Sequence, residues 1–250
     1  MTELELIIDL HKDSERQGPG SEKDTLKALD FLNLPTDQYM KVADIGCGSG
    51  GQTISLAKKI NGQLIAVDLF PEFLNELLEK SKNLGFANKI VTLEKSMDDL
   101  PFNEGEFDLI WSEGAIYSIG FEKGIKKWKD YLKVGGYLAV SDITWITQSR
   151  PKEIEDFWVA EYPEVATASN KIKQLENHGY TLVGYFYLSQ NSWIETYYKP
   201  MQSRFEKFLE RNNNSELARK VVENNQAEID LYQKFKDYYS YGFYIARKKE

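Results

Sequence analysis

One segment constrains the fold of this chain more than any other. A short apolar run at residues 42–45 leads directly into a glycine-rich stretch at 46–51, which reads Gly-Cys-Gly-Ser-Gly-Gly, and then into a helical pattern. Glycines let the backbone approach a ligand closely, and the N-terminus of a helix presents unpaired amides. The segment therefore predicts an α/β protein that binds a nucleotide-like ligand at this turn.

Short β-rich runs and amphipathic stretches continue to alternate along the chain, which predicts βαβ units and a mostly parallel sheet. Up to residue 142 we expect strands and helices in alternation, with strands at 42–45, 64–67, 90–93, 107–111 and 137–142 and helices at 53–57, 71–84 and 122–132. Beyond it we expect helices at 151–162, 170–177, 194–209 and 216–236, and strands at 181–188 and 238–247.

The length and the continuity of this pattern predict one domain over residues 1–250. Within it we expect an N-terminal helical cover at 1–40 and a ligand-binding core at 41–142. Residues 143–250 complete the sheet and carry a helical cap, with an insertion at about 193–236.

Composition narrows the partners and the compartment. With 31 basic and 39 acidic residues the chain has a net charge of −8, so we expect no nucleic-acid partner. The single cysteine, Cys47, cannot form a disulfide within the chain, and two histidines, His11 and His178, are too few for a His/Cys metal cluster. Residues 1–17 do not resemble a secretion signal, and no run is long and apolar enough to span a membrane. We expect a soluble, cytoplasmic protein without a metal.

Two acids sharpen the prediction for the glycine-rich turn. Asp68 closes the second predicted strand, 22 positions after Gly46, where an acid can accept hydrogen bonds from both hydroxyls of a ribose. The glycines also satisfy the GxGxxG pattern of dinucleotide-binding proteins, which keeps a nicotinamide-dependent oxidoreductase as an alternative. Asp44 argues against it, because a dinucleotide-binding strand normally holds an apolar side chain at that position. A buried carboxylate needs a partner.

Residues 42–50, with Asp44 before the glycines, resemble the first motif of Rossmann-like S-adenosylmethionine-dependent methyltransferases. The resemblance continues in order through Asp68, Leu-Pro-Phe at 100–102, the strand at 107–110, residues 132–138 and Ser-Asp at 141–142. It is greatest to the small-molecule branch typified by ubiquinone and menaquinone methyltransferases. It implies a seven-stranded, mostly parallel sheet with helices on both faces, an antiparallel last strand and helical insertions in the C-terminal half.

The resemblance also implies the cofactor, S-adenosylmethionine, its product S-adenosylhomocysteine, and a set of cofactor-binding residues. In that family the acid at Asp44 and the loop after it hold the methionine portion, whose ammonium group suits a carboxylate. One departure is that Ser96 stands where the branch usually has an acid for the adenine amino group; its hydroxyl, the Met97 backbone and Asp98 are the substitutes. The predicted set is Gly20, Asp44, Gly46, Cys47, Gly48, Asp68, Leu69, Ser96, Met97, Asp98 and Glu113.

Methyl transfer from a sulfonium is an in-line displacement, so no catalytic signature is obligatory. Glu113 and Tyr117 follow the fourth strand, Trp145 follows the fifth, and His11 lies in the N-terminal segment; these are the candidates for contact with an acceptor. A sharper alternative pairs Glu113 with Glu122, as in the double-glutamate loop of protein arginine methyltransferases.

The sequence thus predicts an S-adenosylmethionine-dependent methyltransferase (EC 2.1.1.-) that acts on a small-molecule acceptor. Besides the oxidoreductase, a second alternative is a binding module that senses the cofactor without transferring a methyl group. The acceptor and the oligomeric state stay open, with a homodimer among the options.

Overall fold

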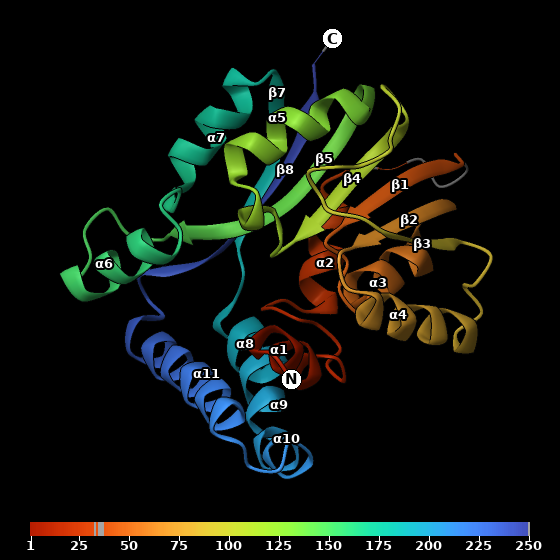
Figure 1. Cartoon of the computed structure of the whole chain (residues 1–250). Helices are drawn as coiled ribbons and strands as arrows, with labels where there is room; N and C mark the ends of the chain where they lie inside the picture. The colour runs from red at the N-terminus through yellow and green to blue at the C-terminus, as the bar shows by residue number, and fades with distance from the viewer. Residues whose placement is uncertain (33, 35–37, 250) are drawn as a thin grey trace.

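The computed structural model describes residues 1–32, 34 and 38–249. Its centre is an eight-stranded sheet whose main path has the order β3-β2-β1-β4-β5-β8-β7 (Figure 1). The strands of this path are β1 (Met40–Ile45), β2 (Gly62–Asp68), β3 (Ile90–Glu94), β4 (Phe107–Glu113), β5 (Leu132–Trp145), β7 (Tyr180–Tyr187) and β8 (Tyr239–Lys248).

The pairing within the sheet confirms the predicted fold class. Strands β1 to β5 pair with one another in parallel. Strand β8 runs antiparallel to both β5 and β7. One further strand was not predicted: β6 (Ala166–Thr167) pairs with the end of β5. Two residues are too few to leave a period-2 pattern in the sequence.

The two faces of the sheet are covered by different helices. Side chains of a strand alternate between faces, so in β1 Val42 enters one hydrophobic cluster and Ala43 the other. Helices α2 (Glu22–Asp30), α3 (Gly51–Lys59) and α4 (Pro71–Asn83) contribute to the first cluster, and α5 (Phe121–Tyr131) and α7 (Ala168–Asn177) to the second. Both faces of the central strands are therefore buried, which explains their nearly continuous apolar runs.

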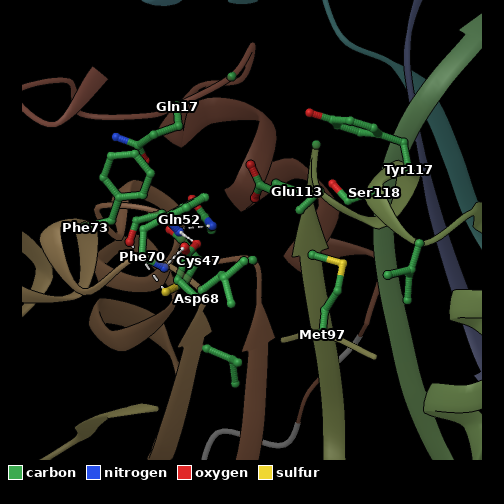
Figure 2. A pocket seen from close by; sticks show the side chains of 18 of the residues that line it. Gln17, Cys47, Gln52, Asp68, Phe70, Phe73, Met97, Glu113, Tyr117 and Ser118 are labelled. Carbon is green, nitrogen blue, oxygen red and sulfur yellow. Dashed lines mark hydrogen bonds between the residues drawn. The ribbon is translucent and has the colours of Figure 1, made fainter. Parts of the chain in front are cut away.

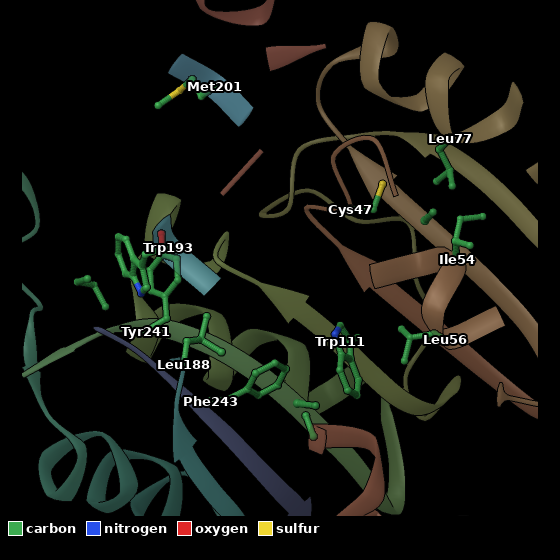
Figure 3. Packing of buried hydrophobic residues seen from close by; sticks show 14 of the residues in the cluster. Cys47, Ile54, Leu56, Leu77, Trp111, Leu188, Trp193, Met201, Tyr241 and Phe243 are labelled. Carbon is green, nitrogen blue, oxygen red and sulfur yellow. The ribbon is translucent and has the colours of Figure 1, made fainter. Parts of the chain in front are cut away.

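A helical cap projects from the sheet between β7 and β8 (Figure 1). It consists of α8 (Gln190–Trp193), the π-helical turn η2 (Ile194–Tyr198), α9 (Lys199–Gln202), α10 (Phe205–Arg211) and α11 (Glu216–Phe235). The prediction of one helix at 194–209 was wrong: the helical stretch begins at Gln190, runs through the π turn and Pro200 to Gln202, and is broken by the turn at Ser203 and Arg204 before α10 begins. The larger hydrophobic cluster extends from Ile54 on α3 to Trp193 and Met201 in the cap (Figure 3).

The N-terminal segment joins the cap to the sheet. Helix α1 (Glu3–His11) packs against α10 and α11, where the Arg211 guanidinium is 2.6 Å from a carboxylate oxygen of Asp9. Helix α2 begins at the N-cap Ser21, as its sequence predicted, and packs against α3. Residues 1–32 therefore bridge two parts of the molecule that are far apart in the sequence.

Two smaller elements complete the chain. Helix α6 (Lys152–Glu161) follows β5, and the short 3₁₀ helix η1 (Ile116–Ser118) follows β4. Gly135 lies inside β5 with a φ of +75°, where the register with β4 shifts between Phe107 and Leu109. The strand accordingly starts at Leu132 rather than 137 and reaches Trp145. Among the described residues no helix is long and apolar enough to cross a membrane.

Candidate active site

A cavity of ≈ 470 Å³ lies at the carboxyl ends of β1, β2 and β4, where open α/β sheets bind ligands (Figure 2). Its walls come from the N-terminal loop, the glycine-rich turn, the ends of β2 and β4, and the loops after β3 and β4. The lining residues are Arg16, Gln17, Gly18, Pro19, Gly46, Cys47, Gly48, Gln52, Val67, Asp68, Leu69, Phe70, Phe73, Lys95, Ser96, Met97, Asp98, Glu113, Gly114, Ala115, Tyr117, Ser118 and Ile119.

The glycine-rich turn needs its glycines. Gly46 and Gly48 have φ values of +76° and +53°, a region that side chains other than glycine rarely adopt. A Cβ atom on Gly46 would lie 2.4 Å from the Cβ of Ala115, and one on Gly48 would lie 2.0 Å from Oε1 of Gln17. The turn is thus held between the loop after β4 and the N-terminal loop, with its backbone along the cavity.

Asp68 lies at the end of β2 and lines the cavity, in the position predicted for a ribose-binding acid. Its Oδ2 accepts a hydrogen bond from the Gly48 amide at 2.8 Å, and its Oδ1 accepts one from the Phe70 amide at 3.0 Å. Burial raises the pKa of this carboxyl group, and the backbone amides of Phe70 and Gly48 partly offset that rise. Each carboxylate oxygen can accept a further hydrogen bond, so the group suits a diol.

Asp44 does not line the cavity, contrary to the direct contact with the methionine portion that the resemblance implied. Its carboxylate is fully enclosed, with Oδ2 accepting from the Thr53 hydroxyl at 2.5 Å and Oδ1 from the Gln52 amide at 3.4 Å. Burial raises its pKa to about 7. Gln52 lines the cavity and also donates to the Cys47 carbonyl at 3.1 Å. Asp44 therefore acts on the site by holding Gln52 and the start of α3.

Glu113 closes the opposite side of the cavity within a buried network. Its Oε2 is 2.6 Å from Nη1 of Arg16, and its Oε1 accepts from the Thr25 hydroxyl at 2.7 Å and from the Trp111 indole at 2.8 Å. The side chains of Arg16 and Glu113 are each 5% exposed. Gly20 does not line the cavity; a Cβ at this position would lie 3.3 Å from Nη1 of Arg16.

Gln17 fastens the N-terminal loop to the glycine-rich turn. Its Oε1 accepts a hydrogen bond from the Ser49 amide at 2.7 Å, and its Nε2 donates to the Ser49 hydroxyl at 3.0 Å and to the His11 carbonyl at 3.2 Å. Residues 16–19 thus form one wall of the cavity (Figure 2).

The predicted adenine-binding residues lie together at the cavity. The Ser96 hydroxyl donates to Oδ1 of Asp98 at 2.8 Å, and Oδ2 of Asp98 is 3.2 Å from the Lys123 ammonium. These two contacts lower the pKa of Asp98. The Met97 carbonyl accepts from the Trp128 indole at 3.1 Å, while its side chain points toward the cavity (Figure 2). Ser96 thereby fixes the Asp98 carboxylate at the cavity wall.

Four residues were predicted to contact an acceptor. Glu113 and Tyr117 line the cavity, whereas His11 and Trp145 do not. The His11 ring is buried and stacks on Tyr197 with ring centres 6.1 Å apart; burial lowers its pKa to about 4. Trp145 packs edge-on against Tyr239, outside the cavity lining. Neither lies where the prediction put it, because α1 and the end of β5 pack against the cap.

The arginine-clamp alternative is wrong. Oε1 of Glu122 is 2.8 Å from Nε2 of His178, outside the cavity lining that contains Glu113. Glu122 begins the α5 helix and pairs across to the end of α7, so the two glutamates do not converge on one site.

Several lining residues were not predicted as site residues. Phe70 and Phe73 face the cavity with ring centres 5.8 Å apart, and Lys95, Gln52, Ala115 and Ile119 complete its wall. Phe73 has the spacing of a core residue of α4, so its pattern indicates packing. Phe70 directly follows the predicted Leu69, and this adjacency is the signal that could have included it. No group of three or more His, Cys, Asp or Glu side chains within 1–32, 34 and 38–249 is placed to hold a metal ion.

Comparison with known proteins gives a family match at this part of the chain. The family model described as "Methyltransferase domain" matches residues 42–136. A sarcosine/dimethylglycine N-methyltransferase of Halorhodospira halochloris is 26% identical over 141 residues, which cover 55% of this chain and 50% of that protein. A chloroplastic tocopherol O-methyltransferase of Arabidopsis thaliana is 30% identical over 42% of this chain and 30% of its own length. The chain thus spans half or less of these relatives.

Solved structures match over nearly the whole chain. An S-adenosylmethionine-dependent methyltransferase from Geobacter sulfurreducens, in complex with S-adenosylhomocysteine, superposes with a TM-score of 0.86 at 16% identity and covers 98% of both chains. A counterpart from Thiobacillus denitrificans in the same complex gives 0.83 at 17% identity, again with 98% of both chains. The shared fold and the family match agree with the resemblance of residues 42–142. Residues 42–136 are therefore similar to a methyltransferase domain, and the whole chain has the fold of these S-adenosylmethionine-dependent methyltransferases.

Proposed function

We propose that the chain is an S-adenosylmethionine-dependent methyltransferase that transfers a methyl group to a small-molecule acceptor. The observation that carries the proposal is the cavity itself, in which the glycine-rich turn, Asp68 and the 96–98 loop meet in one space. The names of similar proteins support the class, since they methylate sarcosine, dimethylglycine, tocopherol or phosphoethanolamine.

The residues present fit the cofactor. Gly46 must lack a side chain, because a Cβ atom there would collide with Ala115. The backbone of the turn is therefore bare at this position, and the methionine portion can approach it closely. Asp68 has acceptor capacity for the two ribose hydroxyls. Phe70 and Met97 offer apolar surface for the adenine ring, with Asp98 next to them for its amino group. Glu113 faces the side from which an acceptor would approach.

The chemistry demands alignment more than proton transfer. When bound, the cofactor supplies an electrophilic methyl group on a sulfonium, and the protein must place a nucleophile in line with it and exclude water. Gln17 holds the N-terminal loop against the glycine-rich turn, and Arg16 holds it against Glu113. The loop thereby encloses the side of the cavity where the methyl donor would lie. Tyr117 lies at the rim on the opposite side (Figure 2).

The remaining predictions on organisation belong to this proposal. One domain fits a hydrophobic cluster that joins α3 to the cap without interruption. The net charge of −8 supports a small acceptor over nucleic acid. A cytoplasmic location stays a prediction from the cysteine content, and the oligomeric state stays open.

The proposal is tested first by cofactor binding. Titration calorimetry with S-adenosylhomocysteine should show binding to the wild type and to Asp99→Ala, whose side chain is exposed beside the adenine loop. In Asp68→Ala we expect affinity to fall roughly 10- to 1,000-fold, since one or two hydrogen bonds to a charged group are lost. An equal affinity in Asp68→Ala would contradict the assigned role of Asp68. Binding of reduced nicotinamide dinucleotide in place of S-adenosylhomocysteine would contradict the proposed function.

Transfer is tested with methyl-labelled S-adenosylmethionine and a small-molecule cell extract, followed by mass spectrometry. A labelled product that Asp68→Ala fails to form would establish the enzyme and give the mass of its acceptor. Binding of S-adenosylhomocysteine without any product would favour a cofactor-sensing module.

A further inference from the structure

Aromatic side chains of β8 and of the cap lie next to the cavity, behind Gly114. Gly114 and Tyr117 line the cavity, and the Tyr241 ring packs so closely on Gly114 that a Cβ there would lie 3.1 Å from it. Tyr241 in turn lies 5.1 Å from the ring of Trp193 in the cap (Figure 3). We call Tyr117, Tyr197, Tyr198 and Tyr241 the tyrosine cluster.

The π-helical turn η2 carries two members of this cluster. Tyr197 and Tyr198 are consecutive and their ring centres are 5.1 Å apart, and the wider π turn brings both toward the interior. The same turn is tied to the N-terminal loop, because the Thr196 hydroxyl donates to the Gly20 carbonyl at 2.7 Å. The cluster is therefore held next to the N-terminal loop.

One carboxylate faces the tyrosine cluster from α11. Glu228 lies on the stripe of that helix which also carries the buried Val221 and Tyr232, and its Oε1 accepts a hydrogen bond from the Tyr198 hydroxyl at 2.9 Å. Burial raises the pKa of Glu228, with Glu161 adding to the rise and Tyr198 opposing it. Burial raises the pKa values of Tyr117, Tyr197 and Tyr241, and the negative charge of Glu228 adds to each rise.

Glu228, like Asp44 and Asp68, has no cation as an ion-pair partner among the described residues. Glu113 is paired with Arg16, and Asp142 is paired with Lys171. Within the described part of the chain, no Lys, Arg or His lies within ion-pair distance of Glu228. The nearby Arg204, which acts on Tyr197, instead donates to the Ser14 hydroxyl and the Leu10 carbonyl.

The tyrosine cluster also has unused polar atoms. In residues 1–32, 34 and 38–249, the hydroxyls of Tyr197 and Tyr241 and the Oε2 atom of Glu228 have no hydrogen-bond partner. None of these three atoms is among the fully buried unpaired atoms of the described residues, so water or a ligand can reach them. Electron-rich ring faces beside a carboxylate form a site whose complement is a cation.

We propose that Glu228 and the tyrosine cluster form the acceptor subsite, and that it takes small molecules carrying a positively charged amino or quaternary ammonium group. The subsite adjoins the cavity at Gly114 and Tyr117, on the side away from Asp68. This inference rests on the proposed function, because it names the class of acceptor. The carboxylate supplies the counter-charge, and the rings enclose the cation and limit its access to water.

The test uses two probes of equal shape and different charge: choline and its neutral isostere 3,3-dimethylbutan-1-ol. Both are titrated calorimetrically into the wild-type protein, with and without saturating S-adenosylhomocysteine. Choline should bind at least tenfold more tightly than the alcohol. Glu228→Gln, which keeps the size of the side chain and removes its charge, should weaken choline binding at least tenfold. Glu223→Gln, on an exposed position of the same helix, should leave it unchanged.

Three results would overturn the inference: no binding of choline, equal binding of the two probes, or equal binding of choline to the wild type and to Glu228→Gln. The comparison of probes in the wild type needs no variant, so it stands even where Glu228→Gln folds poorly. Loss of S-adenosylhomocysteine binding with intact choline binding would instead contradict the proposed function. Failure of the acceptor-subsite inference and failure of the proposed function therefore give different results.

Discussion

Asp44 is a prominent feature of the sequence motif, but its side chain is fully buried in the structure. The pattern around it indicated a ligand-binding acid, and the structure encloses the carboxylate behind Gln52 and Thr53. Sequence spacing can place a residue at the end of a strand, but it does not specify whether a side chain points into the cavity or behind it. Asp68 differs because its strand ends at the cavity rim, and its predicted position agrees with the structure.

The buried carboxyl of Asp44 predicts a specific pH dependence of stability. Its pKa of about 7 in the folded protein lies above the 3.8 of an exposed carboxyl, so the folded state holds the extra proton and loses stability as pH rises between these values. Asp44→Asn removes this loss. Between pH 5 and pH 8 the variant should gain about 2–3 kcal/mol in unfolding free energy relative to the wild type.

Urea denaturation of both proteins at the two pH values measures the effect. The other buried acids are the same in both proteins, so their contributions cancel in the difference in unfolding free energy. Asp99→Asn, at an exposed position, is the control and should follow the wild type. Parallel pH profiles for Asp44→Asn and the wild type would show that Asp44 is ionised in the folded protein throughout this range.

At the scale of elements, the N-terminal segment shows what local patterns omit. The start of α2 at Ser21 was predictable because its N-cap is a local signal. The pairing of Arg16 with Glu113 spans 97 positions, and nothing in either local sequence identifies the partner. The segment's role as a cavity wall follows from that pairing.

Removing one partner of this ion pair should destabilise the protein more than removing both partners. Arg16→Met leaves Glu113 enclosed without its cation, which typically costs about 3–5 kcal/mol. The double variant Arg16→Met/Glu113→Gln leaves no uncompensated charge, so we expect it to be more stable than Arg16→Met by about 1–3 kcal/mol. Denaturation of the wild type, both single variants and the double variant gives the coupling energy directly. Additive losses would mean that the two charges do not stabilise each other.

A second enclosed pair attaches α7 to the sheet. Lys171 donates to Oδ2 of Asp142, which also accepts from the Tyr162 hydroxyl at 3.0 Å. Burial raises the pKa of Asp142 even though Lys171 opposes the rise. The local sequence does not identify Lys171 as the partner of Asp142, because α6 and β6 lie between β5 and α7 in the chain.

Lys171→Met should therefore destabilise the protein by about 3–5 kcal/mol, because Asp142 would keep its place without a cation. Lys173→Met, on the exposed side of the same helix, should stay within about 0.5 kcal/mol of the wild type. Chemical denaturation at pH 7 separates the two. A loss below about 1 kcal/mol for Lys171→Met would indicate that packing, not the ion pair, holds α7.

At the scale of the whole molecule, the parallel half of the sheet was predictable and the cap was only partly so. The central strands β1, β2, β4 and β5 are buried on both faces, and glycine and proline signals bound their apolar runs. In the cap, helix periodicity predicted α11 within a residue, but the π turn and the turn at Ser203 and Arg204 interrupt the regular pattern of the stretch before it. The tertiary fit of aromatic side chains decides such local geometry, and periodicity does not encode it.

The N-terminal loop, the turn and the cap converge on one cavity, so binding should stabilise the molecule globally and protect that loop locally. At about 100 times its Kd, S-adenosylhomocysteine adds about 2.7 kcal/mol, which for a chain of this size raises Tm by roughly 5–11 °C. Because Arg16 and Gln17 line the cavity, tryptic cleavage after Lys12 and Arg16 should slow in the complex. Cleavage after Lys152, whose side chain is 84% exposed outside the cavity, is the control and should continue at its former rate. A raised Tm with unchanged cleavage at both N-terminal sites would mean that the loop does not enclose the ligand, and that the cavity wall formed by residues 16–19 opens in solution.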